Sequence, residues 1–344
     1  MKSIIRWKAL TAAFLAAAGM LLIMGCSRKD EGRTYAIVTK SAQNEYNDLI
    51  VQGFKEVIEE EGGSCLVEQP ESATAESQIR IVEELIQREV DAIAIAANDS
   101  DGLEKVLAEA MEKGIQVSTF DSDSNAKSRK VFVNQALEEE VGKVLMEAVY
   151  DMAEQEGQWA ILSSTSQAAN QNVWINAMKA EVEKEKYRDM RLVDIVYGND
   201  DYEVSVKAAE KLLKEHPDLK VICSPTAVGI KAACQVVSQA ADREVKVTGL
   251  GIPSDIAEYV GNQEEGKPCP YLYLWNPREM GRLSAYVSLN LVDGTISGEV
   301  GETFTTAHNE EFVITQSTNK GSQVVLGEPL YIGPDNIAYW KEKL

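Results

Sequence analysis

Residues 92–123, AIAIAANDSDGLEKVLAEAMEKGIQVSTFDSD, form the stretch of sequence that decides the fold class. Residues 92–97 and 117–120 have the composition of buried strands. Between them lies an amphipathic helix pattern that ends at Gly114. Buried strands joined by a helix are typical of a parallel sheet that helices cover on both faces. The stretch therefore predicts one strand–helix–strand unit of an α/β protein.

The same alternation of strand and helix patterns continues on both sides of this stretch, from Tyr35 to about residue 292. It gives roughly ten strands and divides near VFVNQ, residues 131–135, into two similar halves. A chain of 344 residues also exceeds what one hydrophobic core usually serves. We therefore predict two Rossmann-like lobes, each a parallel sheet with helices on both faces. Residues 303–316 and 324–332 are predicted to be extended or crossover segments.

The N-terminus is predicted to be a lipoprotein signal peptide, residues 1–25. Three basic residues precede an apolar run, residues 9–24, which is short for a membrane-spanning helix. The run ends in IMGC, in which Cys26 would be the lipidated residue and residues 26–33 the tether. The alternative is a retained membrane anchor at the same place.

Composition and charge exclude several classes of function. The formal net charge of −21 disfavours nucleic acid and anionic lipid as partners. The other cysteines form no CxxC pair, so a zinc or iron–sulfur site has no supporting spacing. Cys223 and Cys234 fall in apolar patterns and are predicted to be buried thiols, whereas a disulfide at Cys65 stays open. The fourth of these cysteines is Cys269.

Polar residues stand where the predicted strands end. In open α/β sheets, ligands bind beyond the carboxyl ends of the strands, where the strand order reverses. These positions hold carboxylates, amides, one lysine and a tryptophan, a mixture that suits a neutral ligand rich in hydroxyl groups. Trp174 could cover the apolar face of a sugar, or it could be core. The strand-end residues are Lys40, Asn98, Asp99, Asp121, Asp123, 163–166, 199–201, Pro225, Thr226, Gly251, Trp275 and Asn276.

Other chemistries find less support in the sequence. The segment FDSDSNAKSRK, residues 120–130, turns basic where a calcium loop would need a glutamate. The two histidines, His216 and His308, lie away from the strand ends. A catalytic serine or cysteine there would therefore have no histidine to act as its base. A glycosidase that uses Asp121 with a second acid remains an alternative. No GxGxxG or P-loop motif occurs. We therefore predict a protein with no cofactor and no metal, and not an enzyme.

From about Tyr35 to Lys341 the chain resembles the type I periplasmic solute-binding proteins of sugar ABC importers. The resemblance is closest to rhamnose-binding proteins, with autoinducer-2 receptors as the nearest relatives. It rests on residues 92–123 and on further ordered segments, among them VFVNQA, AILSSTSQAANQNVWINAMK, SPTAVGIKAA, KVTGLGIPSDIAEYV and LWNPREMGRLSAY.

The resemblance implies two lobes joined by a three-segment hinge, with crossings near Gln135, Pro277 and Thr305. The N-terminal lobe would comprise residues 34–135 and 278–304, and the C-terminal lobe residues 136–277 and 305–344. It also implies ligand contacts at Lys40, Asp121, Asn170, Gln171, Pro225, Ala227, Trp275 and Asn276. With the strand-end residues Asn98 and Thr226 and the ring of Trp174, these make up the predicted ligand-binding set.

Asn170 decides between the two ligands that the resemblance suggests. Autoinducer-2 receptors carry an acid at this position, and an amide changes both charge and donor capacity. Rhamnose is therefore favoured, and another deoxy or methyl sugar stays open. Asp121 is predicted to accept hydrogen bonds from sugar hydroxyls, and Asp123 to brace the turn.

The function implied is a monomeric, extracytoplasmic lipoprotein at the cell membrane that delivers a sugar to a permease and its ATPase. Two alternatives remain: an autoinducer-2 receptor, and a sensor that signals to a kinase or chemoreceptor. A LacI-type repressor is disfavoured, because the predicted signal peptide occupies the place of the DNA-binding helices.

Overall fold

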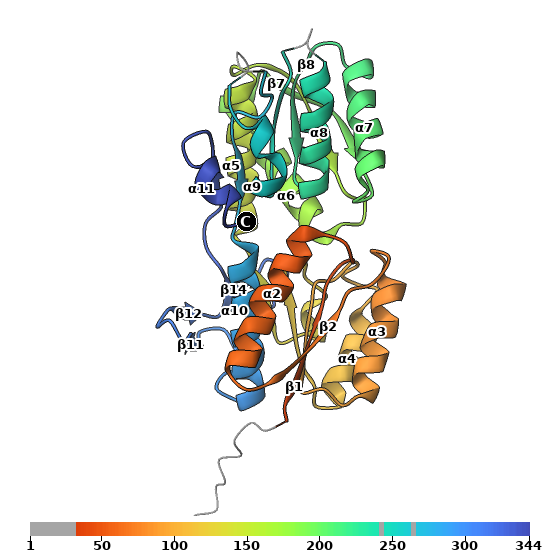
Figure 1. Cartoon of the computed structure of the whole chain (residues 1–344), viewed down its shortest axis with the longest axis vertical. Coiled ribbons are helices and arrows are strands. Elements are labelled where there is room, and N and C mark those ends of the chain that lie inside the picture. The colour runs from red at the N-terminus through yellow and green to blue at the C-terminus, as the bar shows by residue number, and fades with distance from the viewer. Residues whose placement is uncertain (1–31, 241–243, 263–265) are drawn as a thin grey trace, which may run out of the picture.

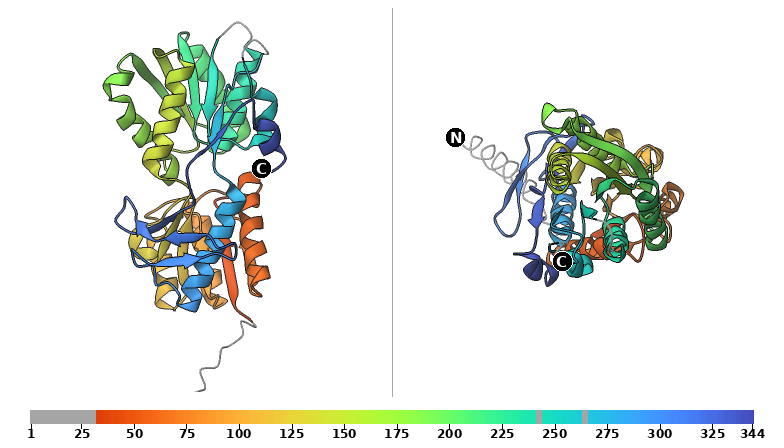
Figure 2. Two further views of the ribbon diagram at one scale, coloured as in Figure 1. Left: turned by 90° about the vertical axis from the view of Figure 1, so that its left-hand side faces the viewer. Right: turned by 90° about the horizontal axis from the view of Figure 1, so that it is seen from above.

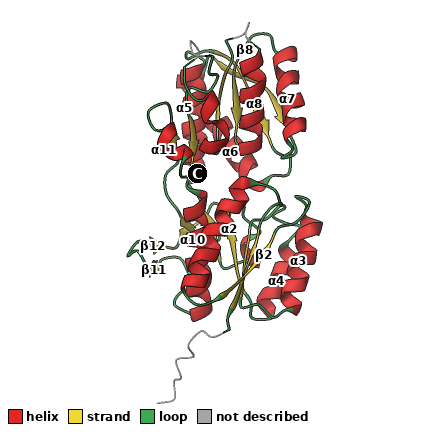
Figure 3. Cartoon of the chain, viewed as in Figure 1, coloured by secondary structure: helices red, strands yellow, loops and turns green. Residues whose placement is uncertain are grey.

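The protein is described from a computed structural model, over residues 32–240, 244–262 and 266–344. Two lobes stack along the long axis of the molecule (Figure 1), and in each of them helices lie on both sides of a sheet (Figure 3). The predicted fold class is thereby confirmed. The predicted signal peptide and the lipidation of Cys26 lie outside the described residues and stay predictions.

The first lobe is built on a seven-stranded sheet in which six neighbouring strands are parallel. The strand order reverses between β1 and β3, so the carboxyl ends of these two strands flank a switch point. In spatial order the strands are β13 (Thr315–Gln316), β14 (Ser322–Val325), β5 (Val131–Asn134), β4 (Gln116–Phe120), β3 (Ala92–Ile95), β1 (Thr34–Val38) and β2 (Ser64–Glu68).

Two pairs of helices cover this sheet. The helices α2 (Glu45–Glu60) and α10 (Pro277–Asp293) pack on one face, and α3 (Ala75–Gln87) and α4 (Glu104–Glu112) pack on the other. The axes of α2 and α10 approach closely because both helices carry a glycine at the contact. A Cβ on Gly281 would lie 1.9 Å from the Ile50 carbonyl oxygen, so no other residue fits there without a backbone shift.

The second lobe repeats the arrangement on a four-stranded parallel sheet. Its spatial order is β7 (Met190–Tyr197), β6 (Gly157–Ser163), β8 (Leu219–Ser224) and β9 (Lys246–Gly249), so the order reverses between β6 and β8. The helices α5 (Glu138–Met152) and α6 (Ala169–Val182) pack on one face, and α7 (Tyr202–Glu215) and α8 (Ala227–Gln239) on the other. The carboxyl ends of the strands in both lobes therefore point toward the space between the lobes.

Three segments cross between the lobes: after β5, before α10, and after β14. The left view of Figure 2 shows the C-terminal segment, in blue, passing from one lobe to the other. The prediction that residues 305–344 belong to the second lobe is wrong for residues 305–325, since β12 pairs with β11 and Ile314 is buried in the core of the first lobe. β14 pairs in parallel with β5, and the amide of Leu326 donates to the Asn134 carbonyl, so the third crossing follows Val325 and not Thr305.

The shorter elements were harder to predict. The prediction of purely parallel sheets is wrong at one edge, where β13 pairs antiparallel with β14, and the helix α11 was missed. β10 pairs antiparallel with β15, and β11 with β12. The remaining elements are η1 (Ala126–Ser128), η2 (Glu185–Tyr187), α9 (Pro253–Ile256), η3 (Ala257–Tyr259), β10 (Leu272–Leu274), β11 (Thr303–Thr305), β12 (Glu311–Val313), β15 (Leu330–Ile332) and α11 (Ile337–Lys341).

The cysteines agree with the sequence analysis. Cys223 and Cys234 are buried free thiols, as predicted, and Cys65 and Cys269 are free as well. No helix within the described ranges is long and apolar enough to span a membrane.

Candidate ligand-binding site

A cavity of about 550 Å³, part of it open to solvent, lies between the two lobes where the strand ends meet. We call it the interlobe pocket. It is lined by Lys40, Asn44, Tyr46, Asn47, Asp121, Asn170, Gln171, Trp174, Asp200, Pro225, Thr226, Ala227, Leu250, Leu274 and Trp275.

Asp121 follows β4 directly and has a φ of +57°, in the left-handed region that aspartate tolerates better than most residues. Its carboxylate is buried, with Oδ1 accepting from the Tyr46 hydroxyl at 2.9 Å and Oδ2 from the Asn170 amide at 3.2 Å. The pKa of Asp121 is raised, mainly by burial and further by the charge of Asp200. The charge of Lys40 and the hydrogen bond from Tyr46 act in the opposite direction. Since neutral donors occupy only part of its lone pairs, this carboxylate can still accept from a ligand.

A chain of hydrogen bonds links the two lobes across the pocket. Lys40, at the end of β1, donates from Nζ to Asn170 Oδ1 at 3.1 Å, and Asn170 in turn donates to Asp121. Asn170 lies in the first turn of α6 in the second lobe, whereas Lys40 and Asp121 belong to the first lobe. A hydroxyl group at this point could donate to the carboxylate and accept from the ammonium. Groups of both lobes would then bind one ligand atom.

Gln171 is fixed by the loop that follows β6. Its side-chain oxygen accepts from the Ser163 hydroxyl at 2.6 Å and from the Ser164 amide at 2.8 Å. These two bonds set the orientation of the side-chain amide, because they identify the oxygen and leave the nitrogen as the donor. Gln171 can therefore present a fixed donor to a ligand oxygen.

Three aromatic side chains form one wall of the interlobe pocket. The Trp174 and Trp275 rings lie 5.4 Å apart, and the Tyr46 ring stands edge-on to Trp275 at 6.5 Å. Trp275 Nε1 donates to the Tyr46 hydroxyl at 2.6 Å. Burial and the Asp121 charge raise the pKa of Tyr46 well above its usual value, so the phenol stays protonated and donates to Asp121. Together with the buried Leu250 and Leu274, this wall offers apolar surface to the ligand.

The opposite wall comes from the loops after β7 and β8. Asp200 has a φ of +53°, and its Oδ1 accepts from the Thr226 hydroxyl at 3.0 Å. Pro225 and Ala227 flank Thr226 and complete the lining on this side. Asp200 is thus the second carboxylate of the pocket, contributed by the second lobe.

Two predicted ligand contacts do not line the interlobe pocket. The Asn98 side chain donates to the Lys40 carbonyl at 2.9 Å, and its backbone amide donates to the buried Gln78, so it holds the β1 turn in place. Asn276 caps α10: its side-chain oxygen accepts from the amides of Arg278 and Glu279. These two residues are absent from the lining of the pocket, and their side chains bind backbone groups. The other nine predicted residues line the pocket.

Six lining residues were missed from the sequence: Asn44, Tyr46, Asn47, Asp200, Leu250 and Leu274. Asn44 gave a usable signal, since an asparagine before a helical pattern is a typical N-cap, and its side chain accepts from the Tyr46 amide at 3.0 Å. Asp200 stood in a strand-end segment but was not separated from Asp201, which caps α7. Tyr46 and the two leucines read as ordinary core residues.

The arrangement favours binding over catalysis. Its ionisable groups are Lys40, Asp121, Asp200 and the neutral Tyr46, and neither histidine of the chain lines it. A cluster with metal-ligand groups occurs among the described residues, Asp194, Glu215 and His216, but it lies at the far end of β7 and α7, outside the pocket. A polar pocket with an aromatic wall between two lobes is typical of a protein that binds a small hydroxylated ligand.

Comparisons with known proteins agree with this class. A family model described as a periplasmic binding protein domain matches residues 35–296. The chain is 45% identical to an ABC transporter solute-binding protein from Clostridium phytofermentas, solved with bound L-rhamnose. The TM-score is 0.88, covering 90% of this chain and 98% of that one.

Two further likenesses are more distant. LsrB from Clostridium saccharobutylicum, solved with AI-2, matches with a TM-score of 0.82 over 89% of this chain and 99% of that one. The two sequences are only 21% identical, so this likeness shows the fold alone. The D-ribose/D-allose-binding protein of Pseudomonas aeruginosa is 28% identical over 267 residues, 72% of this chain and 81% of the relative.

The chain therefore belongs to the periplasmic binding protein family. Within this family it is a solute-binding protein of the sugar ABC transporter class, which binds a ligand and does not convert it.

Proposed function

We propose that the protein is a lipid-anchored, monomeric receptor outside the cell membrane that captures L-rhamnose in the interlobe pocket and delivers it to a permease and its ATPase. The single observation that carries this proposal is the bond chain from Lys40 through Asn170 to Asp121. Lys40 and Asp121 belong to the first lobe and Asn170 to the second, so the chain brings polar groups of both lobes to one place. A ligand hydroxyl that binds there would contact both lobes and hold them together.

The electrostatics of the interlobe pocket support a neutral ligand. Its lining has two carboxylates, Asp121 and Asp200, and one ammonium, Lys40. An additional anionic group on the ligand would face an unfavourable potential, since like charges at close range repel strongly in a partly buried site. Sugar phosphates and uronic acids are therefore disfavoured relative to neutral sugars.

The apolar wall supports a deoxy sugar. Trp174, Trp275, Leu250 and Leu274 can accept the apolar face of a pyranose and a methyl group, whereas a hydroxyl at the same place would lose hydrogen bonds to water. L-Rhamnose combines a methyl group with a set of hydroxyls. The relative with 45% identity is the one solved with this sugar.

The proposed ligand contacts are the predicted residues that line the interlobe pocket, with Tyr46 and Asp200 added. The three crossing segments are proposed to act as a hinge, so that an open form admits the sugar and closure buries it. Asn98 and Asn276 are proposed to position the loop of Lys40 and the start of α10, and not to contact the ligand.

The experiment that tests the function is a thermal-shift screen of residues 27–344 against L-rhamnose, L-fucose, D-ribose, D-allose and AI-2. Ligand at about a hundred times its dissociation constant adds roughly 2.7 kcal/mol to the free energy of unfolding, which raises Tm by several degrees. A rise with L-rhamnose, absent in the Asp121→Ala variant, supports the proposal. A rise with AI-2 alone would assign the protein to signal uptake, and a rise with D-ribose or D-allose alone would make it a receptor for those sugars.

A further inference from the structure

A second cavity, of about 710 Å³ and also partly open to solvent, adjoins the interlobe pocket. We call it the annex. The two cavities share Asp121, Asn170 and Trp174, which therefore form the partition between them. On its other sides the annex is bounded by β5, by the start of α5 and by the loop of residues 317–319 between β13 and β14.

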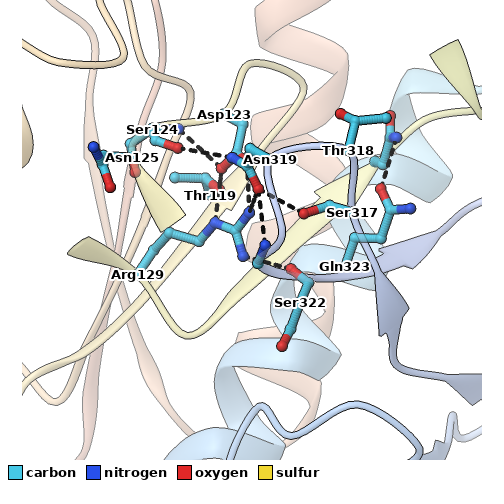
Figure 4. Close-up of polar contacts among 12 residues, drawn as sticks. Thr119, Asp123, Ser124, Asn125, Arg129, Ser317, Thr318, Asn319, Ser322 and Gln323 are labelled. Carbon is cyan, nitrogen blue, oxygen red and sulfur yellow. Dashed lines mark hydrogen bonds and ion pairs between the residues drawn. The ribbon is translucent and has the colours of Figure 1, made fainter. Parts of the chain in front are cut away.

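The wall of the annex is held rigidly by a buried ion pair. The Arg129 side chain is fully buried and pairs with Asp123 at 2.8 Å (Nε to Oδ1), while its Nη1 donates to the Ser322 carbonyl. Asn319 donates to the same aspartate at 2.9 Å. Figure 4 shows these side chains converging on Arg129 from the β4 turn and from the β13–β14 loop. The loop of residues 317–319 is thus joined to the β4 turn.

The lining of the annex has the two kinds of surface that a sugar ring needs. Phe132, Val173 and Trp174 supply an apolar side, and Val173 is 40% exposed. Glu138 and Thr318 supply polar groups at the rim, joined by a long hydrogen bond of 3.4 Å. A pyranose has apolar C–H faces and a rim of hydroxyls, so it can contact both sides at once.

One group in the annex has no partner. Gln135 is 1% exposed, and its Oε1 is buried without a hydrogen-bond partner among the described residues. A buried polar atom left unpaired costs about 1–3 kcal/mol, so a donor that pairs with it is favourable. Gln135 lines the annex, and a turn of its side chain would bring this oxygen to a hydroxyl group of a bound ring.

We propose that the annex binds a second hydroxylated ring, so that the protein accepts rhamnosyl glycosides and disaccharides as well as the free sugar. The inference rests on the proposed function, since the rhamnosyl unit would occupy the interlobe pocket. The Asn170–Asp121 bond, at 3.2 Å, spans the partition between the cavities. A glycosidic oxygen at this point can accept from the Asn170 amide, and a hydroxyl group of the bound sugar can donate to the Asp121 carboxylate in place of that amide.

Isothermal titration of residues 27–344 tests the inference with three probes: L-rhamnose, methyl α-L-rhamnoside, and a disaccharide in which the anomeric oxygen of L-rhamnose is linked to D-glucose. The variant Thr318→Trp fills the annex from an exposed position and leaves the interlobe pocket intact. The matched control is Thr303→Trp, on the exposed side of β11. We expect Thr318→Trp to weaken the disaccharide by about tenfold or more and to leave L-rhamnose within about twofold.

The failures of the two proposals are distinguishable. Binding of L-rhamnose without measurable binding of the disaccharide overturns the annex and leaves the proposed function in place. Disaccharide binding that Thr318→Trp does not weaken also overturns it, because the second ring then lies elsewhere. If none of the three probes binds, the proposed function fails, and the annex proposal fails with it.

Discussion

Asp121 and Asp123 stand two residues apart after the same strand, yet their surroundings differ in kind. Asp121 faces the interlobe pocket and has neutral donors on its oxygens, Tyr46 and Asn170. Asp123 lines the annex and is bound by the buried Arg129 guanidinium, by the Thr119 hydroxyl and by Asn319. Both carboxylates are extensively hydrogen-bonded, but only one has a full opposite charge in direct contact.

The difference shows how one turn can be held in place and still offer a carboxylate to a ligand. The ion pair at Asp123 ties the β4 turn to the β13–β14 loop, so the backbone that carries Asp121 is held from behind. Because this bracing needs nothing from Asp121, that carboxylate remains unneutralised and can accept from a ligand. Four experiments can break or sharpen this comparison.

The largest effect is expected from Asp123→Ala. It leaves the buried Arg129 without its carboxylate, and breaking a buried ion pair in this way costs about 3–5 kcal/mol of unfolding free energy. Urea denaturation measures the change. The matched control is Glu68→Ala, which removes the partner of the exposed Arg88 and should cost less than about 1 kcal/mol. Equal losses in the two variants would mean that Asp123 does not brace the turn.

Asp121→Ala is expected to act on binding instead. Loss of the acceptor between the lobes should weaken the proposed sugar by about a hundredfold or more, equivalent to about 2.7 kcal/mol. Isothermal titration gives the affinity, and urea denaturation of the ligand-free protein should show no loss of stability. Asp101→Ala, an exposed aspartate of the same lobe, is the control. Affinity within a few-fold of the wild type would remove Asp121 from the site.

Tyr46→Phe tests the neutral side of the comparison. It deletes one hydroxyl that donates to Asp121 and accepts from Trp275, so it leaves one acceptor and one donor less well satisfied. A neutral hydrogen bond of this kind contributes about 0.5–1.5 kcal/mol, so a decrease in affinity of up to about tenfold is expected. Tyr339→Phe, on the exposed surface, should bind the sugar like the wild type. If both variants bind equally well, the hydroxyl of Tyr46 does not orient the carboxylate.

The smallest effect concerns pH. Burial raises the pKa of Asp121 above 3.8, so in the window above that value the native state retains a proton that the unfolded state has released. The contribution of Asp121 to stability therefore decreases as the pH rises through this window and is unfavourable above it. Asp121→Asn should remove this dependence and make the ligand-free protein slightly more stable at about pH 7 than the wild type. Urea denaturation at a series of pH values measures the free energy of unfolding of both proteins. If it varies with pH in the same way in both, Asp121 is not the group responsible.

Much of the fold and of the site could be predicted because both follow from local pattern. The alternation of strands and helices fixed the fold class, and the rule that ligands bind at strand ends brought out Lys40, Asp121 and Pro225. Asn276 and Asn98 also stand at strand ends, but their side chains bind backbone groups. An asparagine at a strand end can serve either purpose. Nothing in a single sequence distinguishes the two uses.

Residues without a local signal were missed. Tyr46 lies in the first turn of α2, and only the approach of Trp275 and Asp121 gives its hydroxyl a role. The strand β14 follows the third crossing predicted near Thr305, and its pairing with β5, about 190 residues earlier in the chain, depends on a contact that no local pattern encodes.

The sequence by itself determined that this chain forms two α/β lobes and that polar residues gather where their strands end, because periodicity and strand-end chemistry are local properties. Only the tertiary structure decided which of two neighbouring aspartates remains receptive to a ligand, which asparagines hold the backbone, and that a second cavity adjoins the first. These depend on distances between side chains far apart in the sequence, and such distances are set by the packing of the whole molecule.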